Sequence, residues 1–155
     1  PTIVYGVYKK FDDRNLSRIK NFLKIMPFCI LPSRTGYRQP IHYSQLSKLA
    51  YLYLEKFSNI NSKEIINKVI EVGGDQELSY KDLLFKLSTS STNFFRKKCF
   101  LIQIPNRLFY LLFSPLLIFK PKFFDEIYRI QSDLSGFPKY SDYTGENPKN
   151  FPIDI

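Results

Sequence analysis

The sequence predicts an α/β fold that becomes more helical toward its C-terminal end. Through the first 90 residues, short β-branched or apolar runs alternate with segments whose apolar residues recur at helical spacing. Beyond residue 105 the apolar segments are longer and are broken by prolines. The chain has 155 residues, 44% hydrophobic and 24% charged, which is typical of one soluble domain and excludes disordered, collagen-like and disulfide-scaffold proteins.

The N-terminal part contains residues that mark where strands and helices begin and end. Gly6 ends a β-branched run, Asn15 is the expected N-cap of the first helix, and Pro27 ends that helix. Ser44 is the expected cap of the most regular helix, and we expect its apolar face to be buried. That face consists of Leu46, Leu49, Ala50, Tyr53, Leu54 and Phe57. The expected elements are a strand at 1–5, a helix at 16–26, an apolar run at 28–31, an extended piece at 40–43 and a helix at 44–57.

The C-terminal part predicts a strand, a helix, another strand and then helices. Ser79 and Asp82 have the spacing of a capping box, followed by Leu83, Leu84 and Leu87 on one helix face. The segment 106–119 is interrupted by a proline and is too short to span a bilayer, so we expect a buried or interfacial helix there. The other expected elements are a strand at 67–72 that turns into the helix at the glycine pair 73–74, a strand at 99–104, a helix beginning at 121, and a coil packed over the surface at 137–155.

The formal net charge is +9, and it is concentrated near the N-terminus. Residues 1–57 carry 10 basic and 3 acidic residues, whereas residues 106–155 carry 6 of each. Such a field suits a nucleic acid, a membrane surface or a phosphorylated small ligand, and charge alone does not separate these partners. The two cysteines, Cys29 and Cys99, are expected to be reduced, buried thiols, as in a cytoplasmic protein.

Few residues have the spacing of a catalytic or cofactor motif. The six glycines form no dinucleotide-binding or Walker pattern, and the single histidine, His42, excludes a histidine metal cluster, so no metal site is expected. Tyr5 and Lys9 have the Tyr-x-x-x-Lys spacing, but Tyr5 ends a strand whereas that chemistry needs a helix, so we expect no catalytic residue here. Arg38, after a glycine turn, is expected to be either a ligand-binding residue or a solvated loop arginine.

Several segments, taken in order, resemble one enzyme family. They are Pro1-Thr2-Ile3-Val4-Tyr5-Gly6, then Asp13-Arg14-Asn15-Leu16, then Arg38-Gln39-Pro40-Ile41-His42-Tyr43 before a helix, and then Val72-Gly73-Gly74 with Leu78 to Leu84. The stretch 129–137 and the pair Phe151-Pro152 complete the pattern. The chain is similar to the C-terminal half of an extended short-chain dehydrogenase/reductase of the NAD-dependent epimerase/dehydratase family, which acts on nucleotide sugars.

The resemblance implies a Rossmann-like fold whose distal, substrate-side part spans residues 1–155. It implies NAD as the cofactor, bound mainly by an N-terminal half that would also carry the glycine-rich loop and the catalytic Tyr-x-x-x-Lys. Pro1 and Thr2 would lie near the nicotinamide, and Arg38 and Gln39 would face the substrate, with Arg38 on the diphosphate. The family often has an acidic residue at the position of Gln45. The resemblance therefore leaves open that this chain has an altered substrate or a weakened activity.

The resemblance also implies partners: a nucleotide-sugar substrate, the N-terminal half, and a second copy in a homodimer of the full-length protein. From the residues we expect no transmembrane segment, because the apolar segment 106–119 is too short, and no nucleic-acid partner, because the basic residues form no recognised nucleic-acid motif. The chain begins inside a predicted strand and without an initiator Met, which favours a piece of a longer protein. Two alternatives stay open: a basic module that binds nucleic acid or a membrane surface, and an inactive, truncated homologue.

Overall fold

The computed structural model describes residues 3–8, 11–13, 16–58, 69–89 and 99–153. The chain divides into two compact units, each built from separate stretches of sequence. Unit 1 comprises Pro1–Asp13, Gln39–Glu77 and Ser135–Ile155, and unit 2 comprises Arg14–Arg38 and Leu78–Leu134. Both are mixed α/β structures with small two-stranded sheets, as the sequence predicts.

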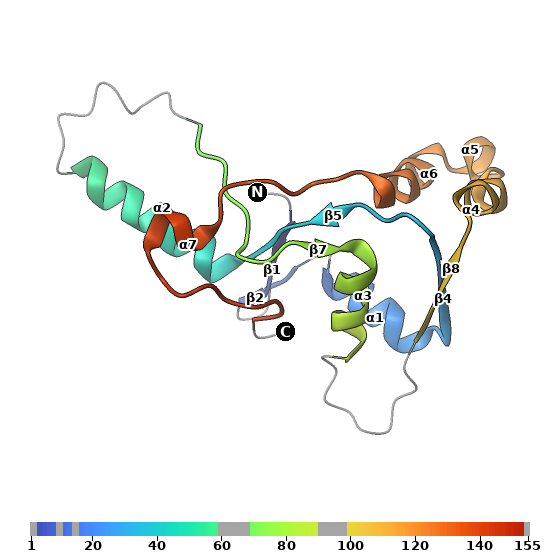
Figure 1. The fold of residues 1–155 in the computed structure, drawn as a ribbon, viewed down its shortest axis with the longest axis horizontal. Coiled ribbons are helices and arrows are strands. Elements are labelled where there is room, and N and C mark those ends of the chain that lie inside the picture. Colours follow the sequence, from blue (N-terminus) through green and yellow to red (C-terminus); the bar gives the residue numbers. More distant parts are fainter. Residues whose placement is uncertain (1–2, 9–10, 14–15, 59–68, 90–98, 154–155) are drawn as a thin grey trace. The chain divides into compact units, whose positions relative to one another are not determined.

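Unit 1 is built around a parallel pair of strands, β1 and β6, in which Ile3 pairs with Pro40 and Tyr5 with His42. Helix α2 follows β6 directly, and α7 lies beside α2 (Figure 1). Ile41, Leu49, Val72 and Tyr140 form the buried cluster between these elements. The elements are β1 (Ile3–Tyr5), the antiparallel pair β2 (Val7–Tyr8) and β3 (Phe11–Asp12), β6 (Pro40–His42), α2 (Tyr43–Ser58) and α7 (Tyr140–Thr144).

Three predictions for unit 1 need correction. The expected strand 67–72 is absent from its described part, 69–72, and Gly73 makes only an isolated bridge with Lys139, so the glycine pair follows coil instead of a strand. On α2, Leu49 is buried but Ala50 and Leu54 are exposed, because the neighbouring elements cover only a narrow stripe of the helix.

The third correction concerns the C-terminal tail, which was expected to be coil throughout. It contains α7, whose first residue, Tyr140, is 1% exposed. The Asp142 carboxylate accepts a hydrogen bond from the Lys139 N–H at 3.0 Å and caps this helix, and Gly145 ends it in the left-handed conformation at φ +69°. The tail therefore contributes to the core of unit 1.

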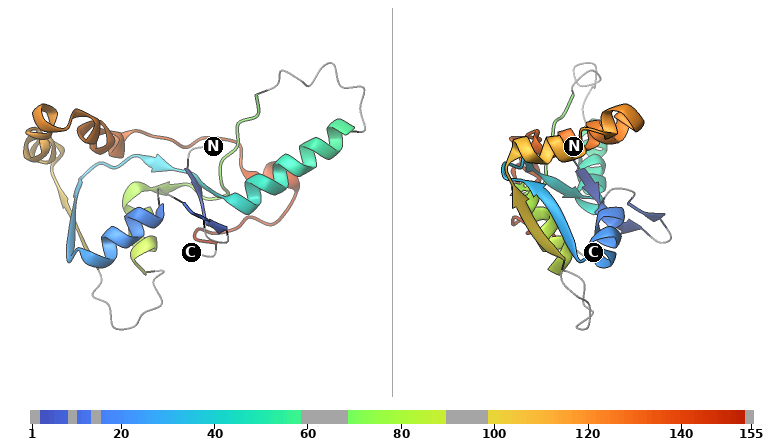
Figure 2. Two further views of the ribbon diagram at one scale, coloured as in Figure 1. Left: turned by 180° about the vertical axis from the view of Figure 1, so that it is seen from behind. Right: turned by 90° about the vertical axis from the view of Figure 1, so that its right-hand side faces the viewer.

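Unit 2 contains a five-residue parallel pair, β4 and β8, in register from Phe28 with Phe100 to Pro32 with Ile104 (Figure 2). Ser79 caps α3 as predicted: its Oγ accepts the Asp82 N–H at 3.1 Å and lies 2.6 Å from the Asp82 carboxylate. The buried residues Leu83, Leu84 and Leu87 form the inner face of α3. The elements are α1 (Leu16–Ile25), β4 (Phe28–Pro32), β5 (Tyr37–Arg38) antiparallel to β7 (Leu78–Ser79), α3 (Tyr80–Thr89) and β8 (Phe100–Ile104).

The rest of unit 2 is helical: α4 (Asn106–Phe113), α5 (Leu116–Phe119), α6 (Pro121–Tyr128) and a short 3₁₀ turn (Arg129–Gln131). Pro115 separates α4 from α5, as predicted. Phe109 is buried, whereas most of the large apolar side chains of α4 and α5 are exposed. Of the expected buried or interfacial helix, the buried alternative is therefore wrong and the interfacial one stays a prediction. Among the described residues, no helix has the length and apolarity needed to cross a bilayer.

Candidate functional site

The loop Ser33–Gly36 joins β4 to β5 and is fixed at both ends by backbone hydrogen bonds. The Ser33 N–H donates to the Ile104 carbonyl at 2.8 Å, and the Gly36 N–H donates to the Ile130 carbonyl at 2.8 Å. A Cβ at Gly36 would lie 2.1 Å from the Ser132 carbonyl oxygen, so this approach requires glycine. The sequence pattern Ser-Arg-Thr-Gly therefore produces a loop with a defined path.

Asn106, the first residue of α4, holds the middle of this loop. Its Oδ1 accepts hydrogen bonds from the Ser33 hydroxyl at 2.9 Å and from the Arg34 N–H at 3.1 Å. After the loop, the Tyr37 N–H donates to the Asp133 carboxylate at 2.8 Å. The backbone beside the Arg34 side chain is thus held by polar groups from distant parts of unit 2.

A polar pocket of about 410 Å³ lies on this loop. Lys81, in the first turn of α3, donates to Gln103 Oε1 at 2.7 Å, and Gln103 Nε2 donates to the Ser33 carbonyl at 3.2 Å. Two cations, four hydroxyl-bearing side chains and one carboxylate therefore line the same space. The lining residues are Ser33, Arg34, Thr35, Tyr37, Ser79, Lys81, Gln103 and Asp133.

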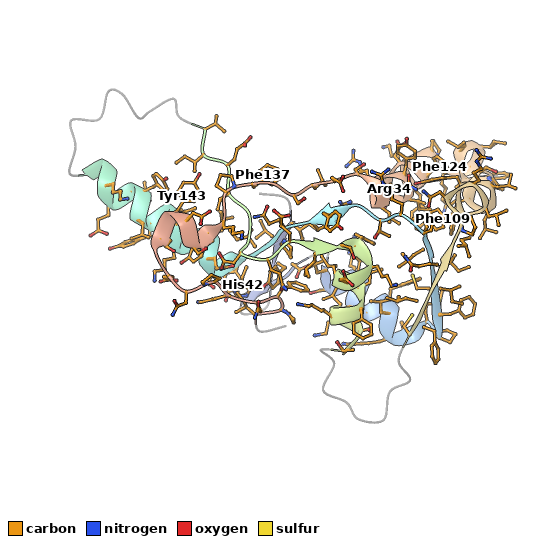
Figure 3. The ribbon with its side chains drawn as sticks, in the orientation of Figure 1. Arg34, His42, Phe109, Phe124, Phe137 and Tyr143 are labelled. Atoms are coloured by element: carbon orange, nitrogen blue, oxygen red, sulfur yellow. The ribbon has the colours of Figure 1, made fainter. Side chains whose placement is uncertain are left out.

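The Arg34 side chain is exposed at this pocket, and the described part of the chain provides no acceptor for its guanidinium. Figure 3 labels Arg34 on the segment between β4 and β5. Neither Arg34 nor Lys81 was identified from the sequence. The sequence predicts a glycine turn before Arg38 and a capping box at Ser79, but no local signal indicates that these two segments meet.

Arg38, the predicted substrate-binding arginine, lies in β5 and is only 4% exposed. Its guanidinium donates to the carbonyls of Tyr37, Arg129 and Ser132, and its Cζ lies 5.6 Å from the centre of the Tyr80 ring. Burial lowers the pKa of Arg38, while the charges of Tyr80 and Asp133 oppose that shift. In these contacts Arg38 binds backbone carbonyls, so it is not a solvated loop arginine.

Gln39, the second predicted substrate-binding residue, is fully buried in unit 1. Its Nε2 donates to the carbonyls of Gly74 and Phe137, each at 2.9 Å, and its Oε1 accepts the Phe137 N–H at 3.0 Å. A Cβ on Gly73 would lie 2.4 Å from Gln39 Cδ. The amide of Gln39 therefore connects the glycine pair to the C-terminal segment.

The other residues identified from the sequence have structural contacts. Tyr5 is buried at the end of β1 and accepts the Ile153 N–H at 3.1 Å, in a strand and not in the helix that catalysis would need. His42 is buried beside the end of β6, where its Nδ1 lies 2.7 Å from the Ser44 hydroxyl. Pro1, Thr2 and Lys9, which carry the cofactor prediction and the second half of the Tyr-Lys spacing, lie outside the described residues.

Gln45, at the position where the resemblance leads to the expectation of an acidic residue, is also buried. Its Oε1 accepts the His42 N–H at 3.1 Å, and its Nε2 donates to the Asp75 carboxylate at 3.0 Å. Asp75 additionally accepts the N–H groups of Ser141 and Lys149, at 2.8 and 3.0 Å. A glutamate at position 45 would face Asp75 with like charge, so glutamine suits this contact.

Unit 2 also contains an apolar cavity of about 410 Å³. Aliphatic and aromatic side chains from α1, β4, α3, α4 and α6 line it almost completely. Cys29 is among them, and burial raises the pKa of its thiol, with a further contribution from Cys99. Both cysteines are free thiols, Cys29 half-buried and Cys99 buried.

Over the described residues, no three His, Cys, Asp or Glu side chains gather closely enough to hold a metal ion. No protein-family model matches the sequence, and no curated protein matches it.

Proposed function

We propose that this chain is the substrate-side portion of an NAD-dependent oxidoreductase that resembles nucleotide-sugar epimerases and dehydratases. One observation carries the proposal: two of the resembling segments, around Ile3–Tyr5 and around Pro40–His42, pair as neighbouring parallel strands. They are separated by more than 30 residues, and a parallel pair requires a crossover of this kind. Helix α2 follows β6 immediately, in the order expected for the distal half of a Rossmann-like extended reductase.

The described residues do not form a cradle for NAD. The space beside the adjacent glycines Gly73 and Gly74 is already occupied by protein atoms. A Cβ on Gly74 would lie 1.8 Å from the Pro40 carbonyl oxygen, and a Cβ on Gly73 would contact Gln39. A dinucleotide phosphate needs open backbone N–H groups at a helix N-terminus. We therefore assign NAD binding and hydride transfer to an N-terminal half. We assign the binding of the nucleotide sugar to this chain, with Arg38 and Gln39 as residues of its substrate side.

The proposal predicts a separation of binding from catalysis. The 155-residue chain should bind nucleotide sugars and show no turnover with NAD, because its sequence contains no glycine-rich loop and no helical Tyr-x-x-x-Lys. Saturation-transfer NMR with UDP-, dTDP- and GDP-sugars measures the first property, and NADH absorbance at 340 nm measures the second. Folded protein that binds none of these sugars at millimolar concentration, or that turns them over, contradicts the proposal.

A second candidate, a membrane-surface module, is favoured by the helices α4 to α6. Leu111, Ile118 and Phe119 are 69%, 82% and 79% exposed, and the exposed cations Lys120 and Lys122 follow them directly. Exposed apolar side chains beside cations are typical of helices that lie in the headgroup region. Co-sedimentation with phosphatidylglycerol vesicles tests this candidate, with Ile118→Ser/Phe119→Ser as the variant. Equal recovery of wild type and variant with the vesicles would exclude it.

A further inference from the structure

We propose that the polar pocket on the Ser33–Gly36 loop binds a diphosphate group, through the side chains of Arg34 and Lys81. The inference rests on the proposed function, which it deepens by assigning the phosphoryl contacts of the nucleotide sugar to these two residues. Arg38, the arginine expected from the resemblance, binds the carbonyls of Tyr37, Arg129 and Ser132 and is not among the lining residues of the pocket.

The charges at the pocket favour an anion. Arg34 and Lys81 supply two positive charges, and Asp133 supplies one negative charge that is already hydrogen bonded to the Tyr37 N–H. The guanidinium group offers paired N–H donors that match two phosphate oxygens, whereas the ammonium group acts as a point charge. This combination fits a diphosphate, which carries several oxygens and more than one negative charge.

The donors at the pocket are available for a ligand. The Arg34 guanidinium has no acceptor in the described part of the chain, while the Arg34 backbone is fixed by Asn106. Lys81 uses one N–H for Gln103, which leaves two of its three N–H groups for a ligand. The Thr35 hydroxyl lines the same space, whereas the Ser79 hydroxyl there is already bonded to Asp82.

The walls of the pocket are fixed before any ligand arrives. Gly36 is hydrogen bonded to Ile130 and to Tyr80, and Arg38 holds the carbonyls of Arg129 and Ser132. A preorganised loop loses little conformational freedom when it binds, so more of the interaction energy appears as affinity. The volume of about 410 Å³ is within the range of about 300–1,000 Å³ usual for small-molecule sites.

The test is calorimetric titration of the 155-residue chain with inorganic pyrophosphate and, separately, with UDP-glucose, dTDP-glucose and GDP-mannose. Arg34→Gln and Lys81→Gln should each weaken pyrophosphate binding about tenfold, because each removes a charge-assisted hydrogen bond. Asp133→Asn should strengthen it about threefold, because the repulsive charge is lost while an acceptor for Tyr37 remains. Arg18→Gln and Lys122→Gln remove exposed cations elsewhere in unit 2 and are the matched controls.

Circular dichroism and the urea midpoint of each variant verify that it is folded. If pyrophosphate does not bind the folded wild type, or binds it and Arg34→Gln equally, the inference is overturned. If a nucleotide sugar binds but neither variant weakens it, the inference is overturned and the proposed function stands. If pyrophosphate shows the expected variant pattern and no nucleotide sugar binds at millimolar concentration, the pocket is supported and the proposed function is contradicted.

Discussion

Arg34 and Arg38 are four residues apart, in the loop after β4 and in β5, and their guanidinium groups occupy opposite environments. Arg34 is exposed at a polar pocket and lacks an acceptor in the described part of the chain. Arg38 is 4% exposed and donates to three backbone carbonyls while it lies over the Tyr80 ring. One arginine has free donors and the other uses its donors within the fold.

The difference shows that a resemblance can identify an important arginine without deciding how it acts. A buried guanidinium that satisfies carbonyls has already exchanged water for protein partners, so a ligand gains less from it. An exposed guanidinium on a fixed loop keeps its donors for a ligand. We therefore expect substitutions at position 38 to affect mainly folding and substitutions at position 34 to affect mainly binding.

The largest expected effect is the loss of stability in Arg38→Met. Methionine retains much of the apolar stem but removes the charged donor from the carbonyls of Tyr37, Arg129 and Ser132, of which the first two keep backbone N–H donors from Leu134 and Ser132. Hydrogen bonds to a charged group are worth about 1.5–3 kcal/mol each, so the loss of three should lower the free energy of unfolding by about 3 kcal/mol or more. Urea denaturation followed by circular dichroism measures this loss.

Arg34→Met is the matched control for that experiment. Its exposed guanidinium has no acceptor in the described residues, and surface substitutions of this kind usually change stability by within about 0.5 kcal/mol. Equal losses in the two variants would contradict the division of roles between the two arginines.

A smaller loss of stability is expected from Gly36→Ala. The new Cβ would lie 2.1 Å from the Ser132 carbonyl oxygen, and the backbone on both sides is held by hydrogen bonds, so the loop must shift. Overpacking of this kind typically costs about 1–3 kcal/mol. Thr35→Ala, one residue earlier, is the control and should cost less, and the urea midpoints compare the two.

Gly36→Ala also tests whether the path of the loop affects pyrophosphate binding. Because the shift would displace Arg34, Gly36→Ala should also weaken pyrophosphate binding at temperatures where the variant is folded. An unchanged affinity together with reduced stability would show that the path of the loop does not position Arg34.

Local signals in the sequence predicted the elements whose ends are capped or broken by particular residues. Ser79 with Asp82 gave the start of α3, and Pro115 gave the break between α4 and α5. Over the described residues 69–72 the strand expected at 67–72 does not form, because Val72 packs in the core and pairs with no strand in the described part of the chain. Strand formation depends on pairing with a second segment, and a single run of apolar residues does not specify that segment.

The candidate site could be predicted only in part for the same reason. Arg38 and Gln39 were selected by resemblance, but their burial depends on Ser132 and Phe137, almost 100 residues later. Arg34 and Lys81 meet because β5 pairs with β7 and β4 with β8, which are long-range contacts. The described residues do not include Pro1 and Thr2, so their cofactor role stays a prediction.

The smallest expected effect concerns the proton on Tyr80, whose ring lies under Arg38. Burial raises the pKa of the Tyr80 hydroxyl, and the positive charge of Arg38 partly opposes that shift. A raised pKa in the folded state means that the contribution of Tyr80 to stability is fully present below its ordinary pKa of 10.0 and is lost as pH rises through the raised value. The wild type should therefore lose stability relative to Tyr80→Phe as the pH rises above about 10.

Urea midpoints of the wild type and of Tyr80→Phe, measured across that pH range, give the change in stability. The titration of Tyr80 also tests the difference between the two arginines. Arg38→Gln removes the opposing charge and should shift the Tyr80 titration, followed at 295 nm as a difference from Tyr80→Phe, to still higher pH. Arg34→Gln should leave that titration unchanged, because the guanidinium over Tyr80 belongs to Arg38. A titration that moves equally in both variants would mean that the two arginines share one electrostatic environment, contrary to their different burial.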